Sequence, residues 1–183
     1  MRKFVRSLAL VAALAAPLSI ASAQSGFGVG SKLFSVGLLG GGASNYGIGA
    51  GAAFEVGVKD FTPELSLGIG GFVGFTHRSD SYFTTSISST TIPIAAIGNV
   101  HYKLKDQPKL DLYGGLNLGF VHYSFSTDYP GYTAGSYGGG SSSLALGLDV
   151  GARYDFAPKV AGFVQLSGGS NFPLYFLGLT FKM

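Results

Sequence analysis

His122 and Ser124 are the two residues best placed for chemistry, because residues two apart on a strand lie on the same face. A histidine beside a serine can remove the hydroxyl proton and turn the oxygen into a nucleophile. Such a pair normally has a third, acidic residue that orients the histidine. No glutamate follows Ser124, so Asp128 or Asp149 would have to take that place. We therefore expect no catalytic residue and no enzymatic activity in this chain.

The three histidines, His77, His101 and His122, are scattered and have no carboxylates at matching spacing. A zinc site needs three or four histidine, cysteine or carboxylate ligands around one point. The sequence has no cysteine, which also excludes disulfide bonds and thiolate ligands. We therefore expect neither a metal site nor a cofactor.

The segments that carry these residues alternate between apolar and other positions. In residues 144–156 every even-numbered residue is apolar, whereas Asp149 and Arg153 occupy odd positions. Side chains of a strand alternate between its two faces, so this segment has one apolar face and one charged face. No 3.6-residue apolar repeat follows residue 23. Alternation recurs and predicts eight strands, at about residues 33–40, 46–58, 65–75, 92–104, 110–120, 144–156, 160–167 and 175–183.

The connections between these strands alternate in length. Residues 59–63, 105–108 and 157–158 read as tight turns, whereas residues 77–91 and 126–143 are long links rich in Ser, Thr, Gly and Tyr. An even number of strands puts both chain ends on the side of the tight turns. The predicted fold is therefore all-β: an eight-stranded antiparallel up-and-down transmembrane β-barrel, with the two long links as extracellular loops.

The composition of the two faces predicts which one points outward. The faces that contain Glu55, Asp149 and Arg153 are otherwise mostly glycine, which suits the narrow interior of an eight-stranded barrel. The opposite faces are apolar and are expected to contact lipid. Four leucines on these faces are Leu116, Leu118, Leu146 and Leu148. A soluble lipocalin-like carrier would need the reverse orientation. It would also carry a Gly-x-Trp motif, and this chain has no tryptophan.

By the same parity, polar and charged side chains point into the lumen. The predicted lumen network consists of Glu55, Glu64, Asn99, His101, Lys103, Asp111, Asn117, Asp149, Arg153, Asp155 and Lys182. Charges in a cavity of low dielectric are costly unless they are paired, so we expect a mutually compensating network. A narrow pore for ions or small solutes is the alternative.

The first 23 residues are predicted to be a cleaved secretory signal peptide. Arg2, Lys3 and Arg6 precede a short apolar core at residues 8–20, and Ala-Ser-Ala at residues 21–23 suits a cleavage site. Residues 24–183 then form the single barrel domain. Three of the twelve basic residues lie in the signal, which leaves nine basic and nine acidic residues in the mature chain. No Lys/Arg cluster remains, so we expect no nucleic-acid partner.

The end of the chain places Tyr175, Leu177, Leu179, Phe181 and Met183 on one apolar face. This segment resembles the carboxy-terminal strand of bacterial outer-membrane β-barrel proteins, which ends on an aromatic residue where this chain has methionine. Over the whole mature chain, the sequence is similar to the small eight-stranded outer-membrane barrels of the outer membrane protein A and X type. The resemblance implies localisation in the bacterial outer membrane, contact with its lipids, and assembly by the barrel-assembly machinery through the C-terminal strand.

We expect a non-enzymatic structural or surface-interaction role through the links at 77–91 and 126–143, toward an external ligand or receptor that the sequence does not identify. His77, Arg78 and His122 stand at the loop ends of their strands and are candidates for lipid-headgroup contact. The His122/Ser124 pair also looks like the His/Ser pair of outer-membrane lipid A deacylases, which are eight-stranded barrels too. That resemblance implies a lipid A-modifying activity, which we hold as the less favoured alternative.

Overall fold

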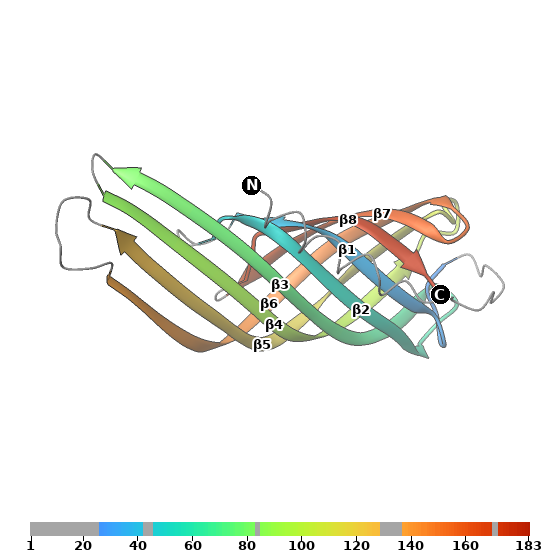
Figure 1. Ribbon diagram of the computed structural model, residues 1–183. Coiled ribbons are helices and arrows are strands. Elements are labelled where there is room, and N and C mark those ends of the chain that lie inside the picture. Colours follow the sequence, from blue (N-terminus) through green and yellow to red (C-terminus); the bar gives the residue numbers. More distant parts are fainter. Residues whose placement is uncertain (1–25, 42–45, 83–84, 129–136, 170–171) are drawn as a thin grey trace.

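Eight antiparallel strands form a closed ring in the computed structural model, which describes residues 26–41, 46–82, 85–128, 137–169 and 172–183 (Figure 1). The predicted signal peptide lies outside the described residues. The strands are β1 (Lys32–Gly40), β2 (Ile48–Asp60), β3 (Leu65–Tyr82), β4 (Thr85–Lys103), β5 (Leu110–Asp128), β6 (Tyr137–Ala157), β7 (Val160–Gly169) and β8 (Tyr175–Lys182). Within the described residues, no helix is long and apolar enough to cross a membrane.

Each strand pairs with its two sequence neighbours, and β1 closes the ring by pairing with β8. Val36 of β1, for example, lies opposite Ala52 of β2 on one side and Leu179 of β8 on the other. Closure leaves no free edge within the ring, so the backbone polar groups are satisfied without water. The predicted fold class and strand number are confirmed.

Four strands are longer than the sequence predicts, and the two long loops are largely strand. β3 and β4 pair as far out as Tyr82 and Thr85, and β5 and β6 pair as far as Thr127 and Tyr137. Together, residues 78–82, 85–89, 121–128 and 137–143 form a four-stranded extension, here called the projecting sheet, which Figure 1 shows beyond the ends of β1, β2, β7 and β8. The prediction of loops at 77–91 and 126–143 is wrong for most of these residues. The Ser/Thr/Gly segments lack the apolar alternation that marks a strand in the sequence. They form strands nevertheless, because pairing with the neighbouring strand satisfies their backbone hydrogen bonds.

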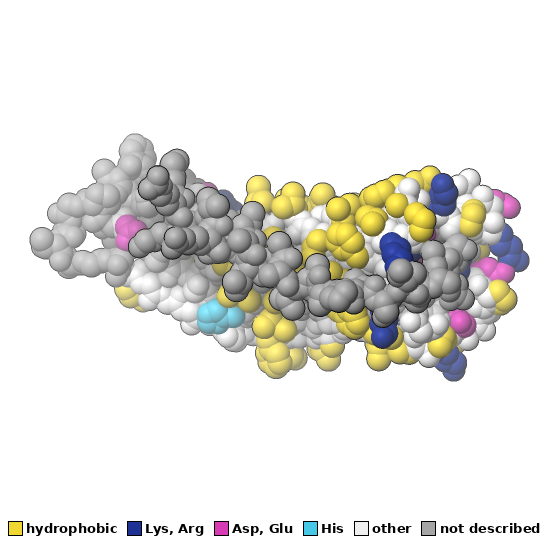
Figure 2. Space-filling view, turned by 45° about the vertical axis from the view of Figure 1, so that its right-hand side comes forward, with side chains coloured by type: hydrophobic (Ala, Val, Ile, Leu, Met, Phe, Trp, Pro, Cys, Tyr) yellow, Lys and Arg dark blue, Asp and Glu magenta, His cyan; other side chains and the backbone are white. Residues whose placement is uncertain are grey.

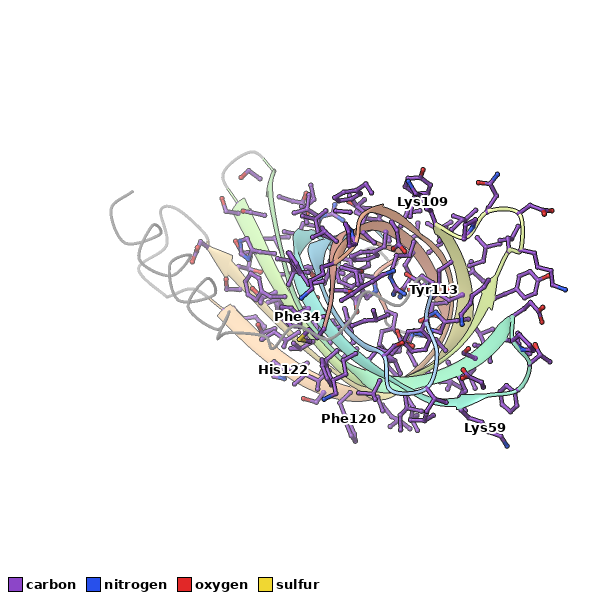
Figure 3. The ribbon with its side chains drawn as sticks, turned by 90° about the vertical axis from the view of Figure 1, so that its right-hand side faces the viewer. Phe34, Lys59, Lys109, Tyr113, Phe120 and His122 are labelled. Carbon is purple, nitrogen blue, oxygen red and sulfur yellow. The ribbon has the colours of Figure 1, made fainter. Side chains whose placement is uncertain are left out.

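The exterior of the ring is apolar. Leu146 and Leu148 of β6 are 57% and 64% exposed, and Leu116 and Leu118 of β5 point outward in the same way. Exposed apolar side chains come from every strand and form an apolar band, part of which crosses the middle of the face seen in Figure 2. Charged side chains gather at the end that bears the tight turns, here called the turn end. Figure 3 shows Phe120 pointing away from the ring and Tyr113 pointing into it. The predicted outward orientation of the leucines is confirmed.

The interior is filled by side chains that lie over glycines. Tyr113 covers Gly151 so closely that a side chain at 151 would collide with its ring. Likewise, a Cβ at Gly51 would lie 2.8 Å from Leu39 Cδ1. Small residues on one strand therefore make room for bulky residues on another, as expected in a ring of only eight strands.

Two apolar layers cross the lumen. Leu39, Phe163 and Phe176 pack in the middle, and the rings of Phe163 and Phe176 meet edge to face at 4.7 Å. Nearer the projecting sheet, Phe172 packs on three small or branched side chains, Ala95, Val121 and Ala145. These layers separate the polar interior from the outer opening of the barrel.

Candidate functional site

A buried cluster of charged residues lies near the turn end of the lumen. It consists of Glu55, His101, Asp111 and Arg153, from β2, β4, β5 and β6, and is here called the charged cluster. Strand parity turns all four side chains inward, because each lies between outward apolar neighbours. His101 Nε2 is 2.8 Å from Glu55 Oε1, and His101 Nδ1 is 2.9 Å from Asp111 Oδ2. The imidazole therefore joins carboxylates on two other strands.

The geometry around His101 indicates how the cluster balances its charge. A neutral imidazole has one N–H, whereas an imidazolium has two and can donate to both carboxylates. Arg153 donates from Nη1 to Asp111 Oδ2 at 2.8 Å, and its Nη2 lies 4.0 Å from Glu55 Oε2. Two cations thus face two carboxylates when His101 is protonated. This pairing offsets the cost of placing ionised groups in the lumen.

Side chains from two further strands, β8 and β1, and a second residue of β5 complete the charged cluster. Arg153 Nε donates to Thr180 Oγ1 of β8 at 3.2 Å, and that hydroxyl lies 2.8 Å from Ser35 Oγ of β1. The Tyr113 ring lies beneath the Arg153 guanidinium, 5.0 Å from ring centre to Cζ. Ser35, Tyr113 and Thr180 were not among the predicted site residues, although their inward parity could have pointed to them.

A second polar layer lies further into the barrel around Asp149. Asp149 Oδ2 accepts hydrogen bonds from Asn117 Nδ2 at 2.9 Å and Gln165 Nε2 at 3.3 Å. The Tyr113 hydroxyl donates to Gln165 Oε1 at 3.2 Å, which links this layer to the charged cluster. Gln165 was not predicted because its strand, β7, carries only a weak apolar alternation.

The described part of the N-terminal segment folds across the turn end. The Phe27 ring stacks on the His101 ring at 3.9 Å, and the Phe27 carbonyl accepts a hydrogen bond from Ser66 Oγ. Backbone hydrogen bonds between Gly30 and Gly57 and between Gly57 and Ser31 hold the segment in place. Beside it a recess of about 300 Å³ remains open to the turn end. Sequence reasoning missed this cover because no alternation or motif marks it.

Several predicted members of the lumen network lie apart from the charged cluster. Asn99 is buried nearby, and Asp155 pairs with Lys182 at the turn-end rim. Lys103 is half-buried at the same rim, where its methylene groups lie close to Gly26. Lys103, Asp155 and Lys182 therefore surround the opening, whereas Asn99 lies in the interior of the lumen.

Glu64 requires a correction, because it does not belong to the lumen network. It lies in the turn between β2 and β3, outside any strand, so strand parity does not apply to it. Its carboxylate pairs with the exposed Lys105 at 3.1 Å. The hydrogen bond from Lys105 holds the pKa of the Glu64 carboxyl below its ordinary value.

The residues predicted for headgroup contact lie on two different faces. His77 and His122 point outward, above the apolar band, and their Nδ1 atoms lie 3.1 Å from Thr90 Oγ1 and 2.9 Å from Ser142 Oγ. Arg78 is the next residue after His77 and points to the inner side, where its Nε lies 2.6 Å from Asp80 Oδ2. Arg78 therefore cannot reach the same headgroups as the histidines.

The His122/Ser124 pair is not hydrogen-bonded in the structure. His122 instead contacts Ser142 of the neighbouring strand β6, its register partner. No group of three or more His, Cys, Asp or Glu in the described part of the chain is arranged to hold a metal ion.

A closed eight-stranded ring with an apolar exterior band and a filled polar lumen defines a transmembrane β-barrel of the outer-membrane type. In this class the short turns face the periplasm, which places the turn end there and the projecting sheet outside the cell. The chain belongs to the outer membrane protein beta-barrel domain family, whose model matches residues 7–166. It is accordingly a bacterial outer-membrane protein, and the soluble-carrier alternative is excluded.

Solved barrels of low sequence identity share this fold. The crystal structure of Ail, the attachment invasion locus protein of Yersinia pestis, has a TM-score of 0.52 at 15% identity, over 85% of this chain and 99% of that chain. The same protein in complex with the heparin analogue sucrose octasulfate has a TM-score of 0.56 at the same identity and coverage. CarO2 of Acinetobacter baumannii is more distant, with a TM-score of 0.46 at 13% identity, over 86% of this chain and 99% of that chain. No curated protein matches the sequence.

Proposed function

We propose that this barrel is a non-enzymatic, closed surface protein that displays the projecting sheet outside the cell as an interaction surface. One observation carries the proposal: the four strands β3 to β6 continue far beyond the membrane band, whereas the lumen beneath them is crossed by apolar layers. Strands that extend well beyond the membrane offer a surface for contact with external molecules, and they would add nothing to a transport path that is closed beneath them. The absence of a His122–Ser124 contact supports the non-enzymatic part of the proposal.

The chemistry of the projecting sheet supports contact through hydrogen bonds. From Tyr137 to Ser142, β6 pairs with β5 on one side only. Its other edge, which faces β7, has no pairing partner among the described strands, because β6 and β7 pair only from Gly147 onward. This edge is exposed and consists mainly of glycine and serine. An unpaired edge presents backbone N–H and C=O groups to any extended chain that approaches it.

Outer-membrane lipids surround the apolar band, and we propose two further contacts of the barrel. His77 and His122 stand outward above that band, where phosphate-bearing headgroups would lie, and their hydrogen-bonding nitrogens suit such groups. The outward apolar face of β8, which includes Leu177 and Leu179, would be the signal that the barrel-assembly machinery reads.

The competing function is a narrow pore, and planar-bilayer recording separates the two. Buried polar atoms without a partner, such as Thr76 Oγ1 and Thr91 Oγ1, favour some hydration of the lumen. If the apolar layers close the barrel, the native protein should show no steady openings. Replacing Phe163, Phe172 and Phe176 together by alanine should then produce them, because both apolar layers lose their aromatic rings. Steady openings of the native protein that change with substitutions at Glu55 or Arg153 would instead establish a pore.

A further inference from the structure

The lipid-facing wall is hollowed near the turn end, across β6, β7 and β8. The hollow has a volume of about 480 Å³, and its surface is almost entirely apolar. Gly162 of β7 forms its floor, because its neighbours in the register are the outward side chains of Tyr154 on β6 and Leu179 on β8. Ala152 of β6 adds a second small side chain. This feature is here called the wall groove.

Large exposed side chains border the wall groove on both sides. Tyr154 and Phe156 are 51% and 57% exposed on one side, and Leu177 and Leu179 are each 42% exposed on the other. A Cβ at Gly162 would lie 3.5 Å from Phe156 Cε1, which is an ordinary contact. The groove therefore depends on the missing side chain of Gly162 and not on a special backbone conformation.

Hydrocarbon surrounds the wall groove, because the groove lies in the apolar band. It lies at the turn end of that band, so it faces the periplasmic leaflet of the outer membrane. An acyl chain in the groove contacts protein on its floor and on both sides, whereas a chain on a flat part of the wall contacts protein on one side only. Each additional close contact adds dispersion attraction. The volume is also in the range of small-molecule sites, about 300–1,000 Å³.

Two lysines at the turn-end rim lie next to the wall groove. Lys109 precedes Leu110, which contributes to the groove, and Lys159 lies in the turn before β7. Both lysines are exposed, and none of the ion pairs among the described residues includes them. Asp155, whose backbone N–H donates to the Lys109 carbonyl, already pairs with Lys182 through its side chain. Lysine side chains at the edge of the hydrocarbon extend their ammonium groups to the headgroup level, so this rim favours a negatively charged headgroup.

We propose that the wall groove binds one anionic phospholipid of the periplasmic leaflet. One acyl chain lies over Gly162, and the phosphate group contacts the ammonium groups of Lys109 and Lys159. A phospholipid whose headgroup carries no net charge would fill the groove but would leave both lysines uncompensated. The site therefore selects among phospholipids, and the proposal does not depend on the role of the projecting sheet.

Native mass spectrometry of the mature barrel in a non-ionic detergent tests the site, with phosphatidylglycerol and phosphatidylcholine of identical acyl chains as probes. The native barrel should retain one phosphatidylglycerol in preference to phosphatidylcholine. Lys109→Gln and Lys159→Gln should each lower this preference roughly fivefold, the effect expected of one lysine near anionic headgroups. Lys59→Gln, at the same end but on β2, should leave it unchanged.

Filling the wall groove should abolish lipid retention, so Gly162→Leu should bind neither probe. Gly98→Leu is the matched control and should retain phosphatidylglycerol. Gly98 lies outward on β4, opposite the exposed Leu116, and no atom lies within 4 Å of a Cβ at this position. The heat-dependent shift in electrophoretic mobility verifies that both variants form closed barrels. Equal retention by the two leucine variants would overturn the proposal.

The native barrel alone also tests the proposal. Equal binding of phosphatidylglycerol and phosphatidylcholine would overturn it without any variant. A dimer of the native barrel that dissociates on Gly162→Leu would overturn it as well, because the groove would then be a contact for a second copy of the chain.

Discussion

At the scale of single residues, the charged cluster holds His101 on every side. Its two ring nitrogens face Glu55 and Asp111, and its ring stacks between Phe27 and Tyr113 at 3.9 and 5.4 Å. A histidine constrained in this way has no open nitrogen for a substrate among the described contacts. The cluster therefore serves to hold strands together across the lumen.

Removing the cation of the cluster should be strongly destabilising. Arg153→Met keeps much of the side-chain volume but leaves Asp111 buried without its guanidinium partner, so the free energy of unfolding should fall by about 3–5 kcal/mol. Urea unfolding of the barrel in lipid vesicles measures this. Lys105→Met, which breaks the exposed pair with Glu64, is the matched control and should change little. Equal effects of the two substitutions would show that burial does not strengthen the Arg153 contacts.

At the scale of secondary-structure elements, a single strand such as β6 passes through two environments. Between Leu144 and Phe156 its outward side chains are apolar, whereas from Tyr137 to Ser142 glycine and serine predominate. The change in composition marks where the strand leaves the membrane. The strand itself continues, because its backbone still pairs with β5.

Leu148 lies near the middle of this outward apolar run, so a charge there should meet the hydrocarbon core. Leu148→Arg should lower the free energy of unfolding by about 2–4 kcal/mol, the cost of arginine at the bilayer midplane. Ser142→Arg, outward on the same strand but beyond the band, should cost much less. Unfolding of both variants in vesicles tests the expectation. A larger loss of stability for Ser142→Arg than for Leu148→Arg would show that the membrane surrounds a different level of the barrel.

At the scale of the whole molecule, ring closure and the projecting sheet are separable. All eight strands contribute to the ring, but only β3 to β6 build the extension. The apolar layers that fill the lumen lie below the projecting sheet and come chiefly from residues within the ring. The barrel should therefore fold without its extension.

Replacing residues 79–88 and 124–140 by short turns should leave a closed barrel. A folded membrane barrel resists detergent and changes its electrophoretic mobility on boiling, so the shortened variant should show the same heat-dependent shift as the native protein. The physical reason is that the removed residues contribute to neither apolar layer. Loss of the shift in the shortened variant, with the shift intact in the native protein, would mean that the extension is needed for closure.

The sequence alone determined the strand number, the lipid-facing side and the membership of the outer-membrane class. These properties depend on a two-residue period, which is local: the alternation of residues 144–156 is visible without knowing what lies beside them. Inward parity likewise predicted that Glu55, His101, Asp111 and Arg153 point into the ring. The prediction for Glu64 was wrong because this residue lies in a turn, where side chains do not alternate between two faces.

Only the tertiary structure decided which residues meet. His101 contacts Glu55, 46 positions earlier, because the register of three neighbouring strands brings the two side chains to one level of the lumen. Register also pairs His122 with Ser142, across strands, instead of with Ser124. The Phe27 cover and the continuation of β3 to β6 beyond the membrane have no periodic signal, since they depend on backbone pairing and on the shape of the opening. Local alternation predicts which face of the barrel wall each side chain lies on. Strand register in the closed ring determines its level along the barrel axis and the residues it contacts.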